Sequence, residues 1–119
     1  MNEFIVWDKT LNCFHFDERV KFEDGVLNPI GKDYTIHQYI GLKDINNKKI
    51  YADSSICRVN YFSSSDWRSD YCYFSFDDEN LRYTVHLINE KEIIDYEGSH
   101  FDCIKIVDTI QENKLGLIK

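Results

Sequence analysis

Apolar and polar side chains alternate in short stretches along most of this chain, and this two-residue period is the feature that most limits its fold. Between residues 55 and 61, for example, Cys57, Val59 and Tyr61 fall on one face of an extended strand. No strong 3.6-residue period, the mark of an amphipathic helix, is present. Tyr and Phe, which suit pleated and half-buried surfaces, dominate the 15% aromatic content. The pattern predicts an all-β barrel or sandwich.

Turn-forming residues divide the chain into nine or ten short strands by our reading of the pattern. Asn28-Pro29 and Gly31 indicate a loop, and residues 63–70 are the most loop-like stretch. Residues 110–117 are expected to form a short helical turn or a tail packed on the sheet. The expected strands are Phe4–Trp7, Leu11–Phe16, Val20–Phe22, Tyr34–Ile40, Ile50–Tyr51, Ser55–Tyr61, Cys72–Phe76, Leu81–Leu87, Ile93–Ile94 and Phe101–Val107.

Length and charge narrow the function classes. The chain has 119 residues, which is the size of one domain, and carries a formal net charge of −7. That charge argues against a general electrostatic grip on nucleic-acid phosphates, which requires clustered Lys and Arg. It fits a protein partner, a protein that competes with nucleic acid for a basic groove, or a requirement for solubility alone.

The cysteines and the N-terminus indicate a cytosolic protein with reduced thiols. The four cysteines form no CxxC pair, and no basic and apolar leader resembling a signal peptide precedes the first expected strand. No stretch approaches the roughly 18 apolar residues that a membrane-spanning helix needs. We therefore expect no membrane association.

Three segments together resemble the YopX family of phage and prophage proteins. Residues 38–51, Q-Y-I-G-L-K-D-I-N-N-K-K-I-Y, resemble that family's "Q-Y-T-G-L-K-D-K-N-G-K-E-I-Y". Residues 4–9, F-I-V-W-D-K, resemble its "F-R-A-W-D-K" opening, and residues 110–113 resemble the last part of "I-G-N-I-Y-E-N-P". The chain departs from the family after Tyr51, where Ala52-Asp53-Ser54-Ser55 replaces the usual "E-G-D-I-V" turn, and at Lys114, where the family has Pro.

The resemblance implies an N-terminal β region, residues 1–40, followed by an SH3-like β-barrel, residues 41–119. It also implies a phage or prophage origin, and hence the host bacterial cytoplasm as location. It supplies no catalytic residue, because the family has no established activity to transfer, and fold alone does not establish function.

The residues themselves indicate no catalytic or metal chemistry. Structural zinc sites show close ligand pairs such as C-x₂₋₄-C, and the nearest pair here, Cys13 and His15, is expected to point to opposite faces of a strand. Cys57, Cys72 and Cys103 share parity with apolar neighbours and are expected to be small buried side chains. A cysteine nucleophile would require a histidine brought near it by the fold, such as His86 near Cys72. No phosphate-binding loop, GxSxG or HExxH motif occurs. We expect neither a cofactor nor a metal, and no enzymatic activity.

Two stretches favour contact with a partner. Trp67 and Arg68 lie in a Ser-rich segment and belong to the residue types enriched at binding hot spots, although Trp67 folding back over one end of the barrel is the alternative. The second stretch is an acidic hairpin turn between aromatic strands, whose alternative is a solvated turn. Trp7, by contrast, is expected in the core. The expected partner-binding residues are Asp66, Trp67, Arg68, Asp70, Tyr71, Asp77, Asp78 and Glu79.

The favoured function is a non-catalytic phage accessory protein that binds a host protein. Its sharpest form is an anti-defence inhibitor, for example of a CRISPR nuclease or its RNA-bound complex. The first alternative is a nucleic-acid-binding SH3-like module, and the second is a structural phage protein that forms homo-oligomers through N-terminal edge strands. The basic stripe of the nucleic-acid alternative would consist of Lys32, Lys43, Lys48, Lys49 and Arg58.

Overall fold

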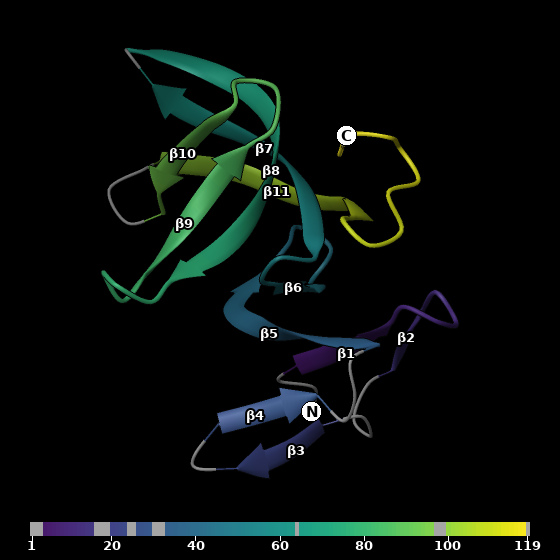
Figure 1. The fold of residues 1–119 in the computed structure, drawn as a ribbon. Helices are drawn as coiled ribbons and strands as arrows, with labels where there is room; N and C mark the ends of the chain where they lie inside the picture. The colour runs from purple at the N-terminus through teal and green to yellow at the C-terminus, as the bar shows by residue number, and fades with distance from the viewer. Residues whose placement is uncertain are drawn as a thin grey trace.

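The computed structural model describes residues 4–15, 20–23, 26–29, 33–63, 65–96 and 100–118. These residues form strands and turns without any helix, which confirms the mainly β fold class (Figure 1). No helix that could cross a membrane is therefore found among them. The strands are β1 (Phe4–Asp8), β2 (Cys13–His15), β3 (Val20–Glu23), β4 (Val26–Pro29), β5 (Tyr34–Lys43), β6 (Lys49–Tyr51), β7 (Ser55–Ser63), β8 (Asp66–Asp77), β9 (Arg82–Leu87), β10 (Glu92–Asp95) and β11 (His100–Thr109).

The described strands form three antiparallel sheets. A four-stranded sheet has the order β2-β1-β5-β6, a five-stranded sheet has the order β10-β9-β8-β7-β11, and β3 and β4 pair as a hairpin. The five-stranded sheet curls into a half-barrel, with the four-stranded sheet beside its open side (Figure 1). The C-terminal segment loops back next to the start of β7 (Figure 1).

The core lies on the concave face of the five-stranded sheet. The alternating positions of β7 that the sequence assigned to one face, Cys57, Val59 and Tyr61, are all buried, as predicted. Ile50 of β6 is fully buried in the same cluster, and Ile40 of β5 packs against it. The end of the β5–β6 hairpin therefore closes the half-barrel with apolar side chains.

Strand β5 takes part in both halves of the molecule. Its first residues pair with β1, from Tyr34 opposite Asp8 to Gln38 opposite Phe4. Its last residues pair with β6 after an irregularity between Tyr39 and Lys43, where Gly41 has a φ of 85°. A side chain other than glycine rarely adopts that conformation, so Gly41 is where the strand can bend toward the half-barrel. The strand passes without a break through residues 40 and 41, the expected boundary between the two regions.

The β5–β6 turn is organised by one buried carboxylate, that of Asp44. Its Oδ1 accepts the N–H groups of Asn46 and Lys48, both at 2.9 Å, and its Oδ2 accepts the N–H of Ile106 in β11 at 3.0 Å. The Ile45 N–H also donates to the Ile104 carbonyl at 2.8 Å. The most recognisable segment of the sequence, residues 38–51, thus encodes a bend, a carboxylate-capped turn and an attachment to β11.

Two local predictions are wrong. Residues 66–70, expected in a loop, belong to β8, because Phe62 pairs with Trp67 and Ser63 with Asp66 and both strands are thereby extended. Residues 26–29, where Asn28-Pro29 indicated a loop, form β4. Pro29 is the last residue of a strand in a two-stranded hairpin, so its missing N–H interrupts no central sheet. Residues 110–117, for which a short helical turn or a tail was expected, form turns and a tail without a regular helix. Gly31 lies outside the described residues.

Cys103 is exposed, which corrects the expectation that it is buried. The register of β11 against β7 shifts between Asp102 and Lys105, and Cys103 has a φ of 51°. Such a bulge leaves one residue unpaired and changes which face the following side chains occupy. Cys57 and Cys72 lie in regular pairing and are fully buried, as predicted.

Candidate functional site

The far end of the β7–β8 hairpin carries an exposed pair of aromatic side chains. Phe62 and Trp67 are cross-strand partners on the face opposite the core, with their ring centroids 5.5 Å apart in an edge-to-face arrangement. Phe62 is 43% exposed and Trp67 is 55% exposed. Trp67 therefore does not fold back over the barrel, which was the alternative reading of this residue.

A third ring extends this row across the sheet. His100 of β11 is the cross-strand partner of Phe62 and is also exposed. We call Phe62, Trp67 and His100 the hairpin-end patch. The next row of the same face is polar: the Ser69 hydroxyl donates to Oδ1 of Asn60 at 2.5 Å, and Asp102 is the partner of Asn60 on β11. An aromatic row with a polar border is the arrangement found at the centre of protein contacts.

Asp66 and Arg68 are the chain neighbours of Trp67 and are both exposed, but they alternate to the opposite face of the hairpin, where Arg68 pairs with Tyr61. The Asp66 carboxylate accepts the N–H of Trp67 at 2.8 Å and so fixes the start of β8. The Arg68 guanidinium lies 4.0 Å from the Glu90 carboxylate, and both side chains are about half exposed. An exposed pair at that distance holds the guanidinium weakly, so it can exchange its partner at low free-energy cost.

Asp70, a predicted contact residue, is only 3% exposed and serves the fold. Its carboxylate accepts the N–H groups of Asn89 and Glu90, both at 3.1 Å, and that of Tyr71 at 2.6 Å. These bonds hold the β9–β10 turn against β8. Tyr71 is half-buried on the outer face of β8, where its cross-strand partner on β7 is Arg58.

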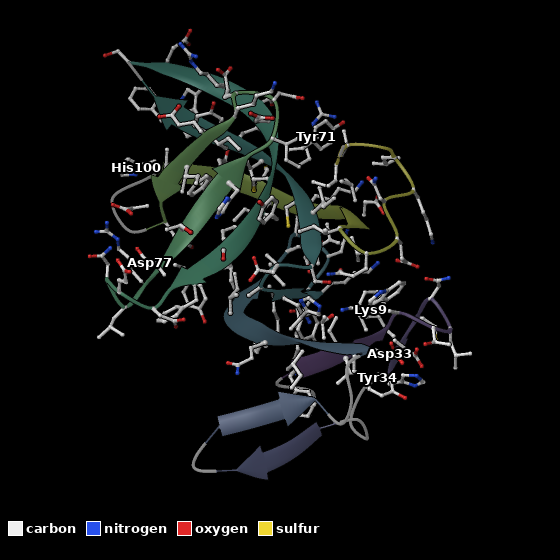
Figure 2. All side chains as sticks on the ribbon, in the orientation of Figure 1. Lys9, Asp33, Tyr34, Tyr71, Asp77 and His100 are labelled. Atoms are coloured by element: carbon white, nitrogen blue, oxygen red, sulfur yellow. The ribbon has the colours of Figure 1, made fainter. Side chains whose placement is uncertain are left out.

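The acidic turn lies at the opposite end of the five-stranded sheet. Asp77 ends β8, and Asp78 and Glu79 follow it in the β8–β9 turn. Eleven residue steps separate Trp67 from Asp78, which is about 35 Å of strand path at roughly 3.3 Å per residue. Figure 2 shows Asp77 on the side of the sheet nearest β5, away from the β7–β8 hairpin end. The predicted site residues therefore form two separate groups.

Asp77 acts mainly on its own turn. Its Oδ1 accepts a hydrogen bond from the N–H of Glu79 at 3.1 Å, and its Oδ2 accepts one from the Asn80 side-chain amide at 2.7 Å. The Asn80 amide and the neighbouring N–H groups hold the pKa of Asp77 below its usual value. Asp78 and Glu79 remain exposed on the outside of the turn.

The basic residues of the nucleic-acid alternative do not form one row. Lys43 and Lys49 are cross-strand partners in β5 and β6, whereas Arg58 lies on the outer face of β7 beside Lys105 of β11. The Lys49 ammonium lies 5.1 Å from the Tyr39 ring centroid. Lys48 is exposed in the Asp44 turn, and Lys32 lies outside the described residues.

Cys13 and His15 form one close cysteine–histidine pair in the described part of the chain. Cys13 and His15 lie on the same face of β2, with Sγ and Nε2 3.9 Å apart, because residues two apart in a strand share a face. The expectation that they point to opposite faces is therefore wrong. His15 also lies 3.1 Å from Oδ2 of Asp8. No group of three or more metal-ligating side chains suited to an ion occurs among residues 4–15, 33–63, 65–96 and 100–118.

His37 is the most enclosed titratable base of the described chain, at 7% exposure. Its Nδ1 is 3.1 Å from the Ala52 carbonyl, so Nδ1 carries the proton and Nε2 accepts. Nε2 lies 2.8 Å from the Thr35 hydroxyl and 3.2 Å from the Gln111 side-chain nitrogen. Gln111 also donates to the Asp53 carbonyl at 2.9 Å. This network joins β5, the β6–β7 turn and the C-terminal tail.

Sequence reasoning missed Phe62 and His100. In the sequence alone, Phe62 looks like a core residue and His100 looks like a loop residue. Their importance depends on the register that places both beside Trp67, and register is set by the whole sheet. The usable signal was the spacing of Phe62 and Trp67 around a Ser-rich tight turn.

The chain was also compared with known proteins. It matches no family model, no curated protein and no solved structure. Its function is therefore argued from its own surface.

Proposed function

We propose that the chain is a non-catalytic accessory protein of phage or prophage origin that binds a host protein in the bacterial cytoplasm. In this proposal the chain is related to the YopX family, and the half-barrel with its β5–β6 closure is the SH3-like barrel that the resemblance implies. The hairpin-end patch is its contact surface, and Arg68 lies on the other face of the same hairpin end.

The observation that carries the proposal is the exposure of the Phe62–Trp67 pair. Two large aromatic side chains stand on solvent-facing positions of the hairpin, where they pack against each other but leave about half of their surface exposed. Aromatic residues and Arg contribute most of the binding free energy at protein contacts. A partner that covers the exposed part of these two rings would therefore gain the free energy of burying them. A hairpin held by seven cross-strand pairs presents them with little entropy left to lose.

The sharpest form of the proposal is inhibition of a host defence enzyme, such as a CRISPR nuclease or its RNA-bound complex. The net charge of −7 matches a partner whose working surface is basic. The chain would then occupy that surface and exclude nucleic acid.

The test is capture of a partner from the native host by tagged wild-type chain, Trp67→Ala, and the matched control Ile93→Ala. Ile93 is an exposed apolar residue on β10 of the same sheet and lies outside the patch. We expect Trp67→Ala to lower affinity by about 30-fold, or about 2 kcal/mol, and Ile93→Ala to have little effect. Nuclease treatment of the lysate should leave capture intact. Equal capture by both variants would refute the patch, and loss of capture after nuclease treatment would refute a direct protein partner.

The defence form has a second readout. Expression of the wild-type chain in a host with an active nuclease defence should restore phage plaques, and Trp67→Ala should not. If the wild-type chain leaves plaque counts unchanged, the proposed inhibition of a defence enzyme is wrong. The proposed contact with a host protein is then tested by the capture experiment alone.

Nucleic-acid binding is the second candidate, and one observation favours it. Arg58, Lys105 and Tyr71 form one row on the outer face of β7, β11 and β8, next to the polar row that borders the patch. Such a face can pair cations with phosphates and stack rings on bases. Fluorescence anisotropy with a labelled single-stranded oligonucleotide at low salt tests it. Binding that is lost on Arg58→Ala/Lys105→Ala would move this candidate to first place, and no binding would eliminate it.

A further inference from the structure

A cleft of about 360 Å³ separates the four-stranded sheet from the β8–β9 hairpin, far from the hairpin-end patch. One wall is Ile36 and Gln38 of β5, and the other is Phe76, Asp78 and Tyr83 of the hairpin. The floor is the Ala52-Asp53 turn. The Ala52 N–H donates to the Gln38 carbonyl and the Asp53 N–H donates to the Phe74 carbonyl, both at 2.8 Å. The two walls are thus joined by backbone hydrogen bonds.

An aromatic pair forms part of this cleft. Phe76 and Tyr83 are cross-strand partners whose ring centroids are 5.0 Å apart at an interplanar angle of 71°. Phe76 is 41% exposed although it occupies a core-facing position, because it lies at the end of the half-barrel where the cleft replaces core packing. A ring in that position offers a face to a ligand.

The charge of the cleft is negative. Asp53 and Asp78 contribute carboxylates, and no lysine or arginine is among the described residues that line it. Arg82, the cation of the β8–β9 hairpin, is engaged by Asp95 at 3.0 Å. The charge of Asp53 also reaches side chains outside the cleft: burial and then the charge of Asp53 raise the pKa of Tyr73, which lies on the outer face of β8. The charge of Asp53 also acts to raise the pKa of His37 and of His86, against the lowering effect of burial.

We propose that this cleft is a receptor for an arginine side chain on a peptide segment of a protein partner. A guanidinium is planar, so it stacks on an aromatic face and donates to carboxylates in the same plane. The cleft supplies Phe76 and Tyr83 for stacking, Asp53 and Asp78 for charge, and the Gln38 side chain as a further polar group. An ammonium lacks the planar fork and would use only the charge. This site goes beyond the proposed function, because it shares no residue with the hairpin-end patch.

The test measures binding of acetyl-Gly-Arg-Gly-Arg-Gly-amide to the full chain by amide chemical shifts in nitrogen-15 NMR spectra at low salt. The peptides with lysine or with the neutral isostere citrulline in place of arginine are the matched probes. We expect the arginine peptide to shift the amides of Asp53, Phe76, Asp78 and Tyr83. The lysine peptide should bind at least fivefold more weakly and the citrulline peptide not measurably.

Variants then locate the site. Asp53→Asn/Asp78→Asn should weaken binding of the arginine peptide by at least tenfold, and asparagine is suited to the φ of 53° at position 53. Phe76→Leu keeps an apolar side chain and should weaken arginine binding by several fold while leaving lysine binding unchanged. Trp67→Ala should bind the peptide as the wild type does, so failure of the hairpin-end patch and failure of the cleft are distinguishable.

The proposal is overturned by any of three results. These are equal binding of the citrulline peptide, equal binding of the lysine peptide, and shifts that map away from the cleft. Absence of arginine-peptide binding at millimolar concentration in a folded chain would also overturn it.

Discussion

Cys57 and Cys72 are cross-strand partners in the core, and both side chains are fully buried. Burial, and then the charge of Asp44, raise the pKa of the Cys57 thiol to about 12. Burial likewise raises the pKa of Cys72. Because the thiolate is the reactive form, these two cysteines are protected twice, by enclosure and by protonation.

Thiol labelling should follow this division. With Ellman's reagent at pH 8, we expect Cys103 to react first, Cys13 more slowly, and Cys57 and Cys72 only after denaturant unfolds the chain. Cys103→Ser should remove the fast phase, and Cys57→Ser should leave it unchanged. Four equally fast thiols in the native chain would show that the core is open.

His37 makes stability depend on pH. Burial lowers its pKa in the folded state below the usual 6.5, so the unfolded chain binds the proton more tightly. The free energy of unfolding is therefore highest above about pH 6.5 and falls as the pH drops below that value, until the folded-state pKa is passed. The Gln111 side-chain amide donates a hydrogen bond to Nε2 of His37. Protonation of Nε2 would place two donors opposite each other and remove this hydrogen bond.

Urea unfolding at pH 7.5 and pH 5.5 measures this effect. Wild type should lose free energy of unfolding over this interval, and His37→Gln, which cannot titrate, should lose less. His86 is shifted in the same direction, so its Gln variant gives the remaining slope. An identical pH slope in wild type and His37→Gln would exclude His37 as the cause.

At the level of elements, one chemistry shapes several turns. Asp8 caps the β1–β2 turn through the N–H groups of Thr10 and Leu11, and Asp44 does the same between β5 and β6. Asp70 holds the β9–β10 turn, and Asp108 holds the C-terminal tail through the N–H groups of Thr109 and Leu115. All four aspartates are buried. The acidic composition is therefore in part a structural requirement for turns.

Replacing Asp44 should show the size of this effect. Asp44→Ala leaves three N–H groups near Asn46, Lys48 and Ile106 without their acceptor, and it should lower the free energy of unfolding by about 2–3 kcal/mol. Asp78→Ala, an exposed aspartate in another turn, is the control and should change it by less than about 0.5 kcal/mol. Chemical denaturation monitored by circular dichroism measures both. A cost at position 44 no larger than at position 78 would contradict the capping role.

The alternation of side chains was enough to predict most of the strands and most of the core, but not β4 or the first part of β8. It placed Trp7 and most inward residues of β7, β8 and β9 correctly, because burial on one face of a strand leaves a local two-residue period. Phe76 and Leu81 share the parity of the buried residues but are exposed, because they lie at the end of the sheet. The alternation did not predict the bulge that exposes Cys103 or the strand pairing at the β7–β8 hairpin end. Both depend on register between strands distant in sequence, which no local pattern records.

The candidate site was predicted only in part, for the same reason. Trp67 and Arg68 stand out by residue type, and both are exposed as a contact surface requires. Asp70 has the same residue type as Asp66, but the β9–β10 turn folds over it and buries it. The separation of the acidic turn from Trp67 follows from the length of β8, which the loop reading of residues 63–70 concealed.

At the level of the whole molecule, the capped turns should fail together in acid. Burial acts to raise the pKa of Asp44 and of Asp108, but their backbone N–H partners outweigh it and hold both below the usual 3.8. The hydrogen bond from Leu11 is the main cause that lowers the pKa of Asp8. A carboxylate with a lowered folded-state pKa stabilises above its unfolded value and loses that contribution as the pH falls through its folded value.

We therefore expect a cooperative acid transition below about pH 4, separate from the gentler slope that His37 produces below pH 6.5. Near-ultraviolet circular dichroism and tryptophan fluorescence should change together over that interval. Asp44→Asn should raise the midpoint pH, because the amide keeps one oxygen acceptor but lowers the native stability. A native signal that persists to pH 2 would contradict this account.

The continuity of β5 has a practical consequence for anyone who shortens the gene. A recombinant fragment that starts at residue 41 would keep Ile50 but lose Ile40, which packs against the same cluster, and Tyr39, the partner of Tyr51. It would also lack His37, and with it the anchor of Gln111. A shortened fragment should therefore start no later than Asp33, so that the whole of this shared strand is retained.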